Sequence, residues 1–262
     1  MPRRRDAEVA IHCTDLSIAR AGRGGPTLRV VDGVSFVLAH GGSLAVMGPT
    51  GAGKSSLAAV LSGSEESGLA IVGGDAVVEG IAVRRPGRQH RVLTYLTGYL
   101  PQSAGSLLPA RATVSEVIGA PITSRDRRVN SRALSIRVAA LLDELMLPLG
   151  AAAKYPYELS AGMRQRVAFA RALVLQPHLF IADEPYANMD LEVRVAARDA
   201  ILRRRSEYGM STVIVTNEAD AVRELEADVL VMRGGHTIAY GRGTSDLLWT
   251  PNGETDHRMI AS

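Results

Sequence analysis

The 262-residue chain has an ordinary globular composition, with 46% hydrophobic and 22% charged residues, which argues against long disordered stretches. Its formal net charge of +3 is too small to indicate a nucleic-acid partner. The single cysteine, Cys13, excludes an intrachain disulfide framework and suits a reducing compartment. No apolar run approaches the roughly 20 residues needed to cross a bilayer, and residues 1–5 are basic but lack the apolar stretch that a signal peptide requires.

The chain opens with a pattern of strands. Alternating apolar residues over 9–18 and 34–38 predict two strands that each bury one face, and the glycine-rich residues 20–27 predict a turn between them. The continuously apolar residues 44–47 predict a strand covered on both faces. A helical pattern begins near Ser55, so the sequence predicts a strand, a glycine-rich loop and a helix in succession.

After this helix, strands and helices are both expected. Residues 68–83 predict short strands broken by glycines, residues 84–91 an exposed loop, and residues 93–100 a further strand. Residues 102–163 have a helical pattern, which includes a capping-box sequence that opens at Thr113. Further apolar runs predict strands at residues 179–182, 213–216, 229–232 and 236–240, the last two as a hairpin.

The glycine-rich loop, from Gly48 to Ser55, matches the phosphate-binding pattern G-x-x-x-x-G-K-[ST] at every fixed position. Glycines let consecutive backbone N–H groups turn toward one concave point, where they hold anionic oxygens. The helix behind the loop adds the positive end of its dipole. Lys54 supplies a cation for the β- and γ-phosphates, and the Ser55 hydroxyl can ligate Mg²⁺.

This loop therefore predicts nucleotide binding, although by itself it does not distinguish kinases, GTPases and transport ATPases. A chance glycine-rich turn is a poor alternative, because an apolar strand precedes the loop and a helix follows it. The nucleotide-binding residues expected in this segment are Gly48, Pro49, Thr50, Gly51, Ala52, Gly53, Lys54, Ser55 and Ser56.

Two acids, Asp183 and Glu184, follow the apolar residues 179–182. In a parallel α/β sheet, ligands bind at the carboxyl ends of the strands. We expect Asp183 to hold Mg²⁺ through a water molecule and Glu184 to polarise the water that attacks the γ-phosphate. Acids after a strand often only cap the next helix, but the preceding phosphate loop favours the catalytic interpretation.

Residues 159–166 read Leu-Ser-Ala-Gly-Met-Arg-Gln-Arg and resemble the signature of the ATP-binding cassette (ABC) family, whose usual form begins Leu-Ser-Gly-Gly. Gln102 follows a predicted strand and Asp190 follows Pro185, as in that family. Together with the phosphate loop and the acid pair, these motifs stand in the family's order, so the resemblance covers nearly the whole chain.

The resemblance implies a mixed α/β fold of the P-loop NTPase class, with residues 1–262 as a single ABC ATPase domain. Residues 1–101 and 164–262 would form the nucleotide-binding core, with a parallel core sheet and an N-terminal antiparallel β-subdomain. Residues 102–163 would form an inserted α-helical subdomain.

The resemblance also implies an ATPase subunit of a transporter, held peripherally at the cytoplasmic face of the cell membrane. A second ABC ATPase subunit, identical or different, would enclose ATP and Mg²⁺ with it, so that the phosphate loop of one subunit faces Ser160 and Gly162 of the other. Gln102 would reach Mg²⁺ and link the site to transmembrane permease subunits, and Asp190 would lie at the seam between the cassettes. The implied metal ligands are Ser55, Gln102 and Asp183.

Residues 162–166 and the Ser-Leu-Leu-Pro sequence at residues 106–109 are similar to the oligopeptide, dipeptide and nickel importer branch. That likeness implies import of peptides or metal chelates, for which an extracytoplasmic substrate-binding protein can be a further partner. Two alternatives stay open: a regulatory nucleotide-binding subunit with little hydrolysis, and a soluble ABC ATPase that acts outside transport.

Three positions depart from the family pattern. Asn217 stands where the family has a histidine beside the γ-phosphate, and its amide can donate a hydrogen bond but cannot carry a positive charge. Ala19 or Arg20 stands where an aromatic residue stacks on adenine; Arg20 either stacks its guanidinium on the base or is a solvated loop residue. Ala161 replaces a signature glycine. The expected catalytic residues are Glu184, Lys54 and Asn217, and we hypothesise a slow site in a heteromeric pair.

Overall fold

The computed structural model of the protein describes residues 9–21, 27–65 and 68–249. The basic residues 1–5 and most of the turn predicted over 20–27 lie outside this part. Within the described part, no helix combines the length and the apolar character that a membrane span requires.

The larger sheet has seven strands in the order β11-β10-β9-β3-β8-β7-β6. These strands are β3 (Ser43–Met47), β6 (Thr97–Leu100), β7 (Leu179–Asp183), β8 (Ser211–Val215), β9 (Asp228–Arg233), β10 (His236–Arg242) and β11 (Asp246–Trp249). From β6 to β9 all neighbours are parallel, whereas β9, β10 and β11 pair antiparallel. Every residue of β7 and β8 is buried, as expected when both faces of a parallel sheet are covered.

The smaller sheet is antiparallel and has the order β2-β1-β4-β5. Its strands are β1 (Val9–Arg20), β2 (Leu28–Ala39), β4 (Leu69–Val78) and β5 (Ile81–Ala82). In the first half of β1, Ile11 and Cys13 are buried while His12 and Thr14 are exposed, as the alternation predicts. In the second half the prediction of one buried face is wrong, because residues 16–19 are all buried.

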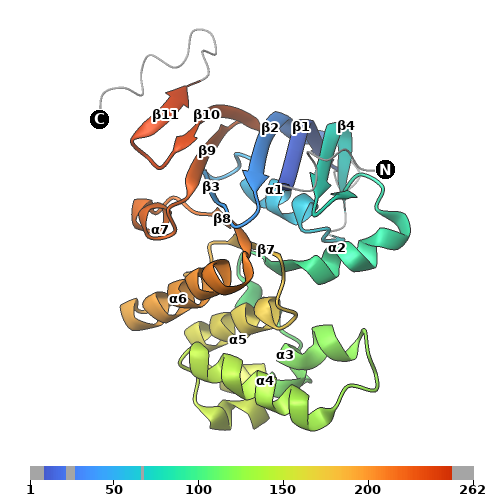
Figure 1. Ribbon diagram of the computed structural model, residues 1–262, viewed down its shortest axis with the longest axis vertical. Helices are drawn as coiled ribbons and strands as arrows, with labels where there is room; N and C mark the ends of the chain where they lie inside the picture. Colours follow the sequence, from blue (N-terminus) through green and yellow to red (C-terminus); the bar gives the residue numbers. More distant parts are fainter. Residues whose placement is uncertain (1–8, 22–26, 66–67, 250–262) are drawn as a thin grey trace.

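Helix α1 (Lys54–Leu61) lies between the two sheets (Figure 1). One hydrophobic cluster joins β1, β2 and α1 to Leu179 and Ile181 of β7. The alternate β7 residues, Phe180 and Ala182, belong to a second cluster on the other face of the sheet. The start of α1 is therefore held against the carboxyl ends of the parallel strands.

Further helices cover the second face of the larger sheet and extend away from both sheets (Figure 1). They are α3 (Val114–Thr123), α4 (Ser131–Glu144), α5 (Ala161–Leu173), α6 (Leu191–Tyr208) and α7 (Ala219–Glu224), with the 3₁₀ turns η3 (Ala104–Leu107), η4 (Leu149–Ala153) and η5 (Pro156–Glu158). The capping box at Thr113 is confirmed, because its hydroxyl accepts from the Glu116 backbone N–H at 3.3 Å and its own N–H donates to the Glu116 carboxylate at 2.7 Å. The expected α/β architecture is confirmed, with a parallel core, an antiparallel sheet and helices between β6 and β7.

The strand predicted over residues 93–100 is wrong in its first half. The turn η2 (Gly87–Gln89) leads into helix α2 (His90–Leu96), and only Thr97–Leu100 form a strand. Leu93 is fully buried whereas Val92 and Tyr95 are about half exposed, which is a helical rather than an alternating pattern. The Thr97 hydroxyl donates to the Leu93 carbonyl at 2.7 Å and closes the helix.

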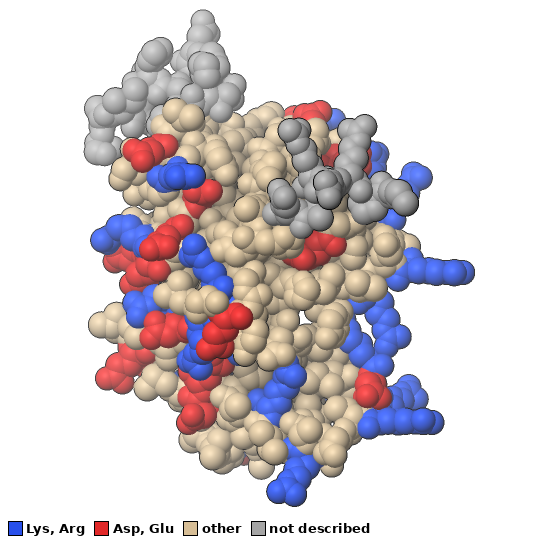
Figure 2. Space-filling model, in the orientation of Figure 1, with Lys and Arg blue, Asp and Glu red and all other residues tan. Residues whose placement is uncertain are grey.

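Acidic and basic side chains alternate on the side of the molecule that carries α6 and α7 (Figure 2). Arg194 of α6 pairs with Glu218, which precedes α7, and Arg198 pairs with Glu224 at 3.8 Å. Exposed pairs of this kind contribute little stability. They do place the Glu218 carboxylate beside the end of β8.

Candidate functional site

The loop between β3 and α1 requires glycine at two positions. Gly48 has φ +137°, and a Cβ there would lie 2.0 Å from the Met232 carbonyl oxygen. Gly53 has φ +97°, and a Cβ there would lie 2.2 Å from the Val30 carbonyl oxygen. No side chain caps the start of α1, so its first N–H groups face the loop and can receive an anion.

Lys54 crosses this loop. Its Nζ donates to the carbonyl oxygens of Gly48 at 2.5 Å and Pro49 at 2.9 Å. The ammonium group is therefore held over the concave side of the loop, where it can meet a phosphate oxygen.

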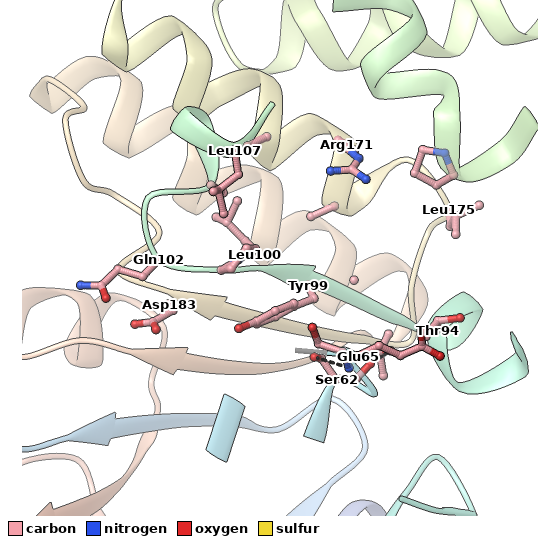
Figure 3. Close-up of a pocket in the computed structure, with 18 of the residues that line it drawn as sticks. Ser62, Glu65, Thr94, Tyr99, Leu100, Gln102, Leu107, Arg171, Leu175 and Asp183 are labelled. Atoms are coloured by element: carbon pink, nitrogen blue, oxygen red, sulfur yellow. Dashed lines mark hydrogen bonds between the residues drawn. The ribbon is translucent and has the colours of Figure 1, made fainter. Parts of the chain in front are cut away.

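A cavity of about 1000 Å³ lies beside the loop, and Ser55, Gln102 and Asp183 contribute to its lining. Figure 3 shows Gln102 and Asp183 at the same end of this cavity, away from Glu65 and Thr94. A hydroxyl, an amide oxygen and a carboxylate are the kinds of oxygen ligand that Mg²⁺ prefers. The donor set therefore fits a magnesium ion.

Glu184 follows Asp183 with φ +49°, a left-handed conformation that costs energy for any residue except glycine. Its N–H donates to the Val215 carbonyl at 2.9 Å, which holds the turn against β8. Burial raises the pKa of the Glu184 carboxyl, and the charges of Asp183 and Glu218 raise it further, while Lys54 opposes the shift. A carboxylate with a raised pKa is a stronger base, which suits proton transfer from water.

Asn217, two residues after β8, contacts the phosphate loop directly. Its Oδ1 accepts a hydrogen bond from the Gly48 N–H at 2.9 Å. The amide oxygen thus fixes the first residue of the loop, which also packs closely on the Met232 carbonyl.

Ser160 and Gly162 lie at the start of α5. Ser160 is the N-cap of α5, and its hydroxyl accepts from the Met163 N–H at 3.2 Å. A Cβ on Gly162 would lie 2.6 Å from the Asn188 carbonyl oxygen, so only glycine fits there without a shift. Neither of these two residues at the start of α5 is among the described residues that line the cavity, and the same holds for Lys54, Glu184 and Asn217.

Asp190, predicted to lie at a seam between cassettes, caps α6 and accepts from the Val193 N–H at 3.0 Å. Two further hydrogen bonds were not predicted from the sequence. Arg20 Nη2 donates to the Ser56 hydroxyl at 3.3 Å. Gln165 of α5 is buried and accepts from the Gly105 N–H at 3.2 Å. The sequence signal for Gln165 was its place in the signature-like residues 159–166, which did not indicate a buried contact with Gly105.

Comparison with known proteins adds independent evidence. Residues 31–187, more than half of the chain, match the family model described as ABC transporter. The oligopeptide transport ATP-binding protein OppD of Mycobacterium tuberculosis is 31% identical over 242 residues, which are 90% of this chain and 37% of OppD. The Fe(3+) ions import ATP-binding protein FbpC of Pseudomonas fluorescens is 32% identical over 213 residues, which are 80% of this chain and 56% of FbpC.

The fold has a close match among solved structures. The dimeric ATP-binding cassette MJ0796, in a post-hydrolysis state with ADP and Pi, superimposes with a TM-score of 0.80 at 20% identity. The match covers 88% of this chain and 98% of that one. At this identity the likeness shows the fold alone.

The phosphate loop, the acids after β7 and the motif at the start of α5 thus occur on a cassette fold and within a matched family segment. The chain spans only 37% and 56% of the lengths of the two relatives named above, but the family match itself covers most of this chain. The chain belongs to the ABC transporter family.

Proposed function

We propose that this chain binds and hydrolyses ATP, and that it powers transport through separate transmembrane permease subunits from the cytoplasmic face of the membrane. The observation that carries the proposal is the meeting of Ser55, Gln102 and Asp183 in one cavity, with Glu184 next in the chain. Phosphate groups, a divalent cation and an activated water are what hydrolysis of a nucleoside triphosphate requires.

Each residue has a distinct role in this proposal. The loop N–H groups and Lys54 bind the β- and γ-phosphates, and Glu184 orients the attacking water and accepts its proton. Ser55, Gln102 and Asp183 would hold Mg²⁺. When bound, the ion neutralises charge on the phosphate oxygens. Asn217 holds the loop through Gly48.

The proposal includes a second ABC ATPase subunit. Ser160 and Gly162 lie at the start of α5, where backbone N–H groups can receive an anion, and their own chain already has the phosphate loop after β3. We therefore assign them to the phosphate site of the partner subunit. The dimeric state in which the MJ0796 cassette was solved supports this arrangement.

For the cargo, we propose import of peptides or metal chelates, with an extracytoplasmic substrate-binding protein as a further component. The support is the likeness to relatives that are named for oligopeptide transport and for Fe(3+) import. Because transport paths lie in the permease subunits, the cargo is a property of the assembly.

Two variants in the assembled transporter, Glu184→Gln and Lys54→Ala, would test ATP hydrolysis. Glu184→Gln should lower hydrolysis at this chain's own site by about 10² or more, since it removes the base, and should leave ATP affinity nearly unchanged. Lys54→Ala should weaken ATP binding. Lys154→Ala, which changes the chain's only other lysine, is the matched control and should alter neither quantity.

The same experiment separates the main alternative, a regulatory nucleotide-binding subunit, which the asparagine at position 217 favours. If hydrolysis at this chain's own site is the same with Glu184→Gln, the site is not catalytic and the regulatory role stands. If Lys54→Ala leaves ATP affinity untouched, nucleotide binding at this loop is itself contradicted.

A further inference from the structure

Arg20 contacts the phosphate end of the site. It is the last residue of β1, and its Nη2 donates to the Ser56 hydroxyl at 3.3 Å. Ser56 is only 6% exposed and lies in the first turn of α1, immediately after Ser55. The guanidinium group is thus directed at the helix start that closes the phosphate loop.

Arg20 also lines the cavity that Ser55, Gln102 and Asp183 line. Strand pairing holds its backbone, because Arg20 lies opposite Leu28 of β2 and Leu69 of β4. The side chain is therefore anchored between the smaller sheet and α1, and it brings a second positive charge to the helix that begins at Lys54.

We propose that Arg20 binds the polyphosphate chain of the nucleotide rather than the base. A guanidinium group presents N–H donors in a planar fork that matches phosphate oxygens, and its charge is permanent. A residue held against the first turn of α1 is placed beside phosphates that this helix start receives. The inference rests on the proposed nucleotide site and assigns it an additional phosphate ligand.

This role has a consequence for specificity. A contact with phosphate oxygens stabilises ATP, GTP and inorganic tripolyphosphate alike, whereas a guanidinium stacked on a base stabilises only ligands that have one. Arg20 should therefore contribute affinity without contributing any preference between bases.

The experiment measures displacement of a fluorescent ATP analogue from the full chain by ATP, by GTP and by inorganic tripolyphosphate. With Arg20→Ala, all three affinities should fall by the same factor, roughly tenfold, as expected for one charge-assisted hydrogen-bonding contact. Arg20→Lys keeps the charge without the planar fork and should restore part of the loss. Arg20→Tyr, which has neither the charge nor the fork, should restore no affinity for tripolyphosphate.

Arg29→Ala is the matched control, because Arg29 lies on the neighbouring strand and is ion-paired with Asp32 at 2.8 Å. It should leave all three affinities unchanged. Thermal unfolding of each variant shows whether the fold is retained, and Arg20→Lys provides the comparison if Arg20→Ala is unstable.

The inference is overturned if Arg20→Ala weakens ATP but leaves tripolyphosphate unaffected, because that result assigns Arg20 to the base. It is equally overturned if Arg20→Ala changes no affinity. A Lys54→Ala variant measured alongside distinguishes a failure of this inference from a failure of the proposed nucleotide site. If Lys54→Ala loses ATP binding and Arg20→Ala does not, the nucleotide site is supported and only the role assigned to Arg20 is contradicted.

Discussion

At the scale of single residues, the site depends on charges that the fold brings together. Glu184 lies between Asp183, Glu218 and Lys54, and its raised pKa follows from its burial and from the two neighbouring carboxylates. A raised pKa means that the carboxyl is protonated over a wider acidic range. Because Glu184 accepts a proton only when ionised, activity should rise with pH through this pKa.

Glu218→Gln tests this electrostatic account. Removing the Glu218 carboxylate removes one charge that raises the pKa of Glu184, so that pKa falls and the acidic limb of the pH–activity profile moves to lower pH. The profile of kcat/KM measures the shift. Glu224→Gln, which changes a surface partner of Arg198, is the control; an unmoved limb in Glu218→Gln would contradict the cause assigned here.

Asn217→His tests the slow-site hypothesis in the assembled transporter. A histidine that contacts the γ-phosphate in the transition state should raise turnover, by up to about 10²-fold if the lost contact is of the oxyanion type. Asn217→Ala serves as the comparison, because it removes the oxygen that accepts from Gly48. No gain with histidine, together with brisk hydrolysis by the unmodified site, would rule the hypothesis out.

At the scale of elements, the phosphate loop is set by how closely two other strands approach it. Gly48 packs on the Met232 carbonyl of β9, and Gly53 packs on the Val30 carbonyl of β2. The glycines of the motif therefore serve tertiary packing as well as the conformation of the loop. Gly51, with φ +81°, has nothing within 4 Å of a Cβ position.

Gly53→Ala and Gly51→Ala separate these two contributions. Both place a side chain at positive φ, which costs about 1–2 kcal/mol of folding free energy. Gly53→Ala should cost more, because the new Cβ would lie 2.2 Å from backbone that must move. Urea unfolding measures the difference, and equal losses in the two variants would show that the contact with Val30 is unimportant.

At the scale of the whole molecule, the parallel sheet joins two apolar layers. Phe180 of β7 meets Phe169 of α5 with ring centroids 5.2 Å apart, and both rings are fully buried. The same strand positions the acids at its carboxyl end. Stability and site geometry therefore depend on the same packing. The division of the chain into a core and a helical subdomain at residues 102–163 stays a prediction.

Phe180→Ala should lower the free energy of unfolding by about 3–5 kcal/mol, because it leaves a cavity between sheet and helix. Chemical denaturation measures the loss. Tyr208→Ala, at a residue that is 63% exposed, should change stability by less than about 0.5 kcal/mol. A small effect of Phe180→Ala would show that the two layers pack independently of this ring pair.

The motifs themselves were readable from the chain, because a phosphate loop, an acid pair after an apolar strand and a capped helix start are runs of consecutive residues whose chemistry is local. Strands β3, β7 and β8 were predictable for the same reason, since burial on both faces requires continuously apolar residues. The helix at residues 93–96 was not predictable, because a short apolar run fits the repeat of a helix as well as that of a strand.

Tertiary packing alone decided which distant residues meet. Asn217 reaches Gly48 across 169 positions of sequence, and Arg20 reaches Ser56 across 36. Gln102 and Asp183, which share a cavity, were expected together only because of the resemblance to the family. Local patterns carry no record of such contacts, since they arise from the order of strands in the sheet and from the layers that cover it.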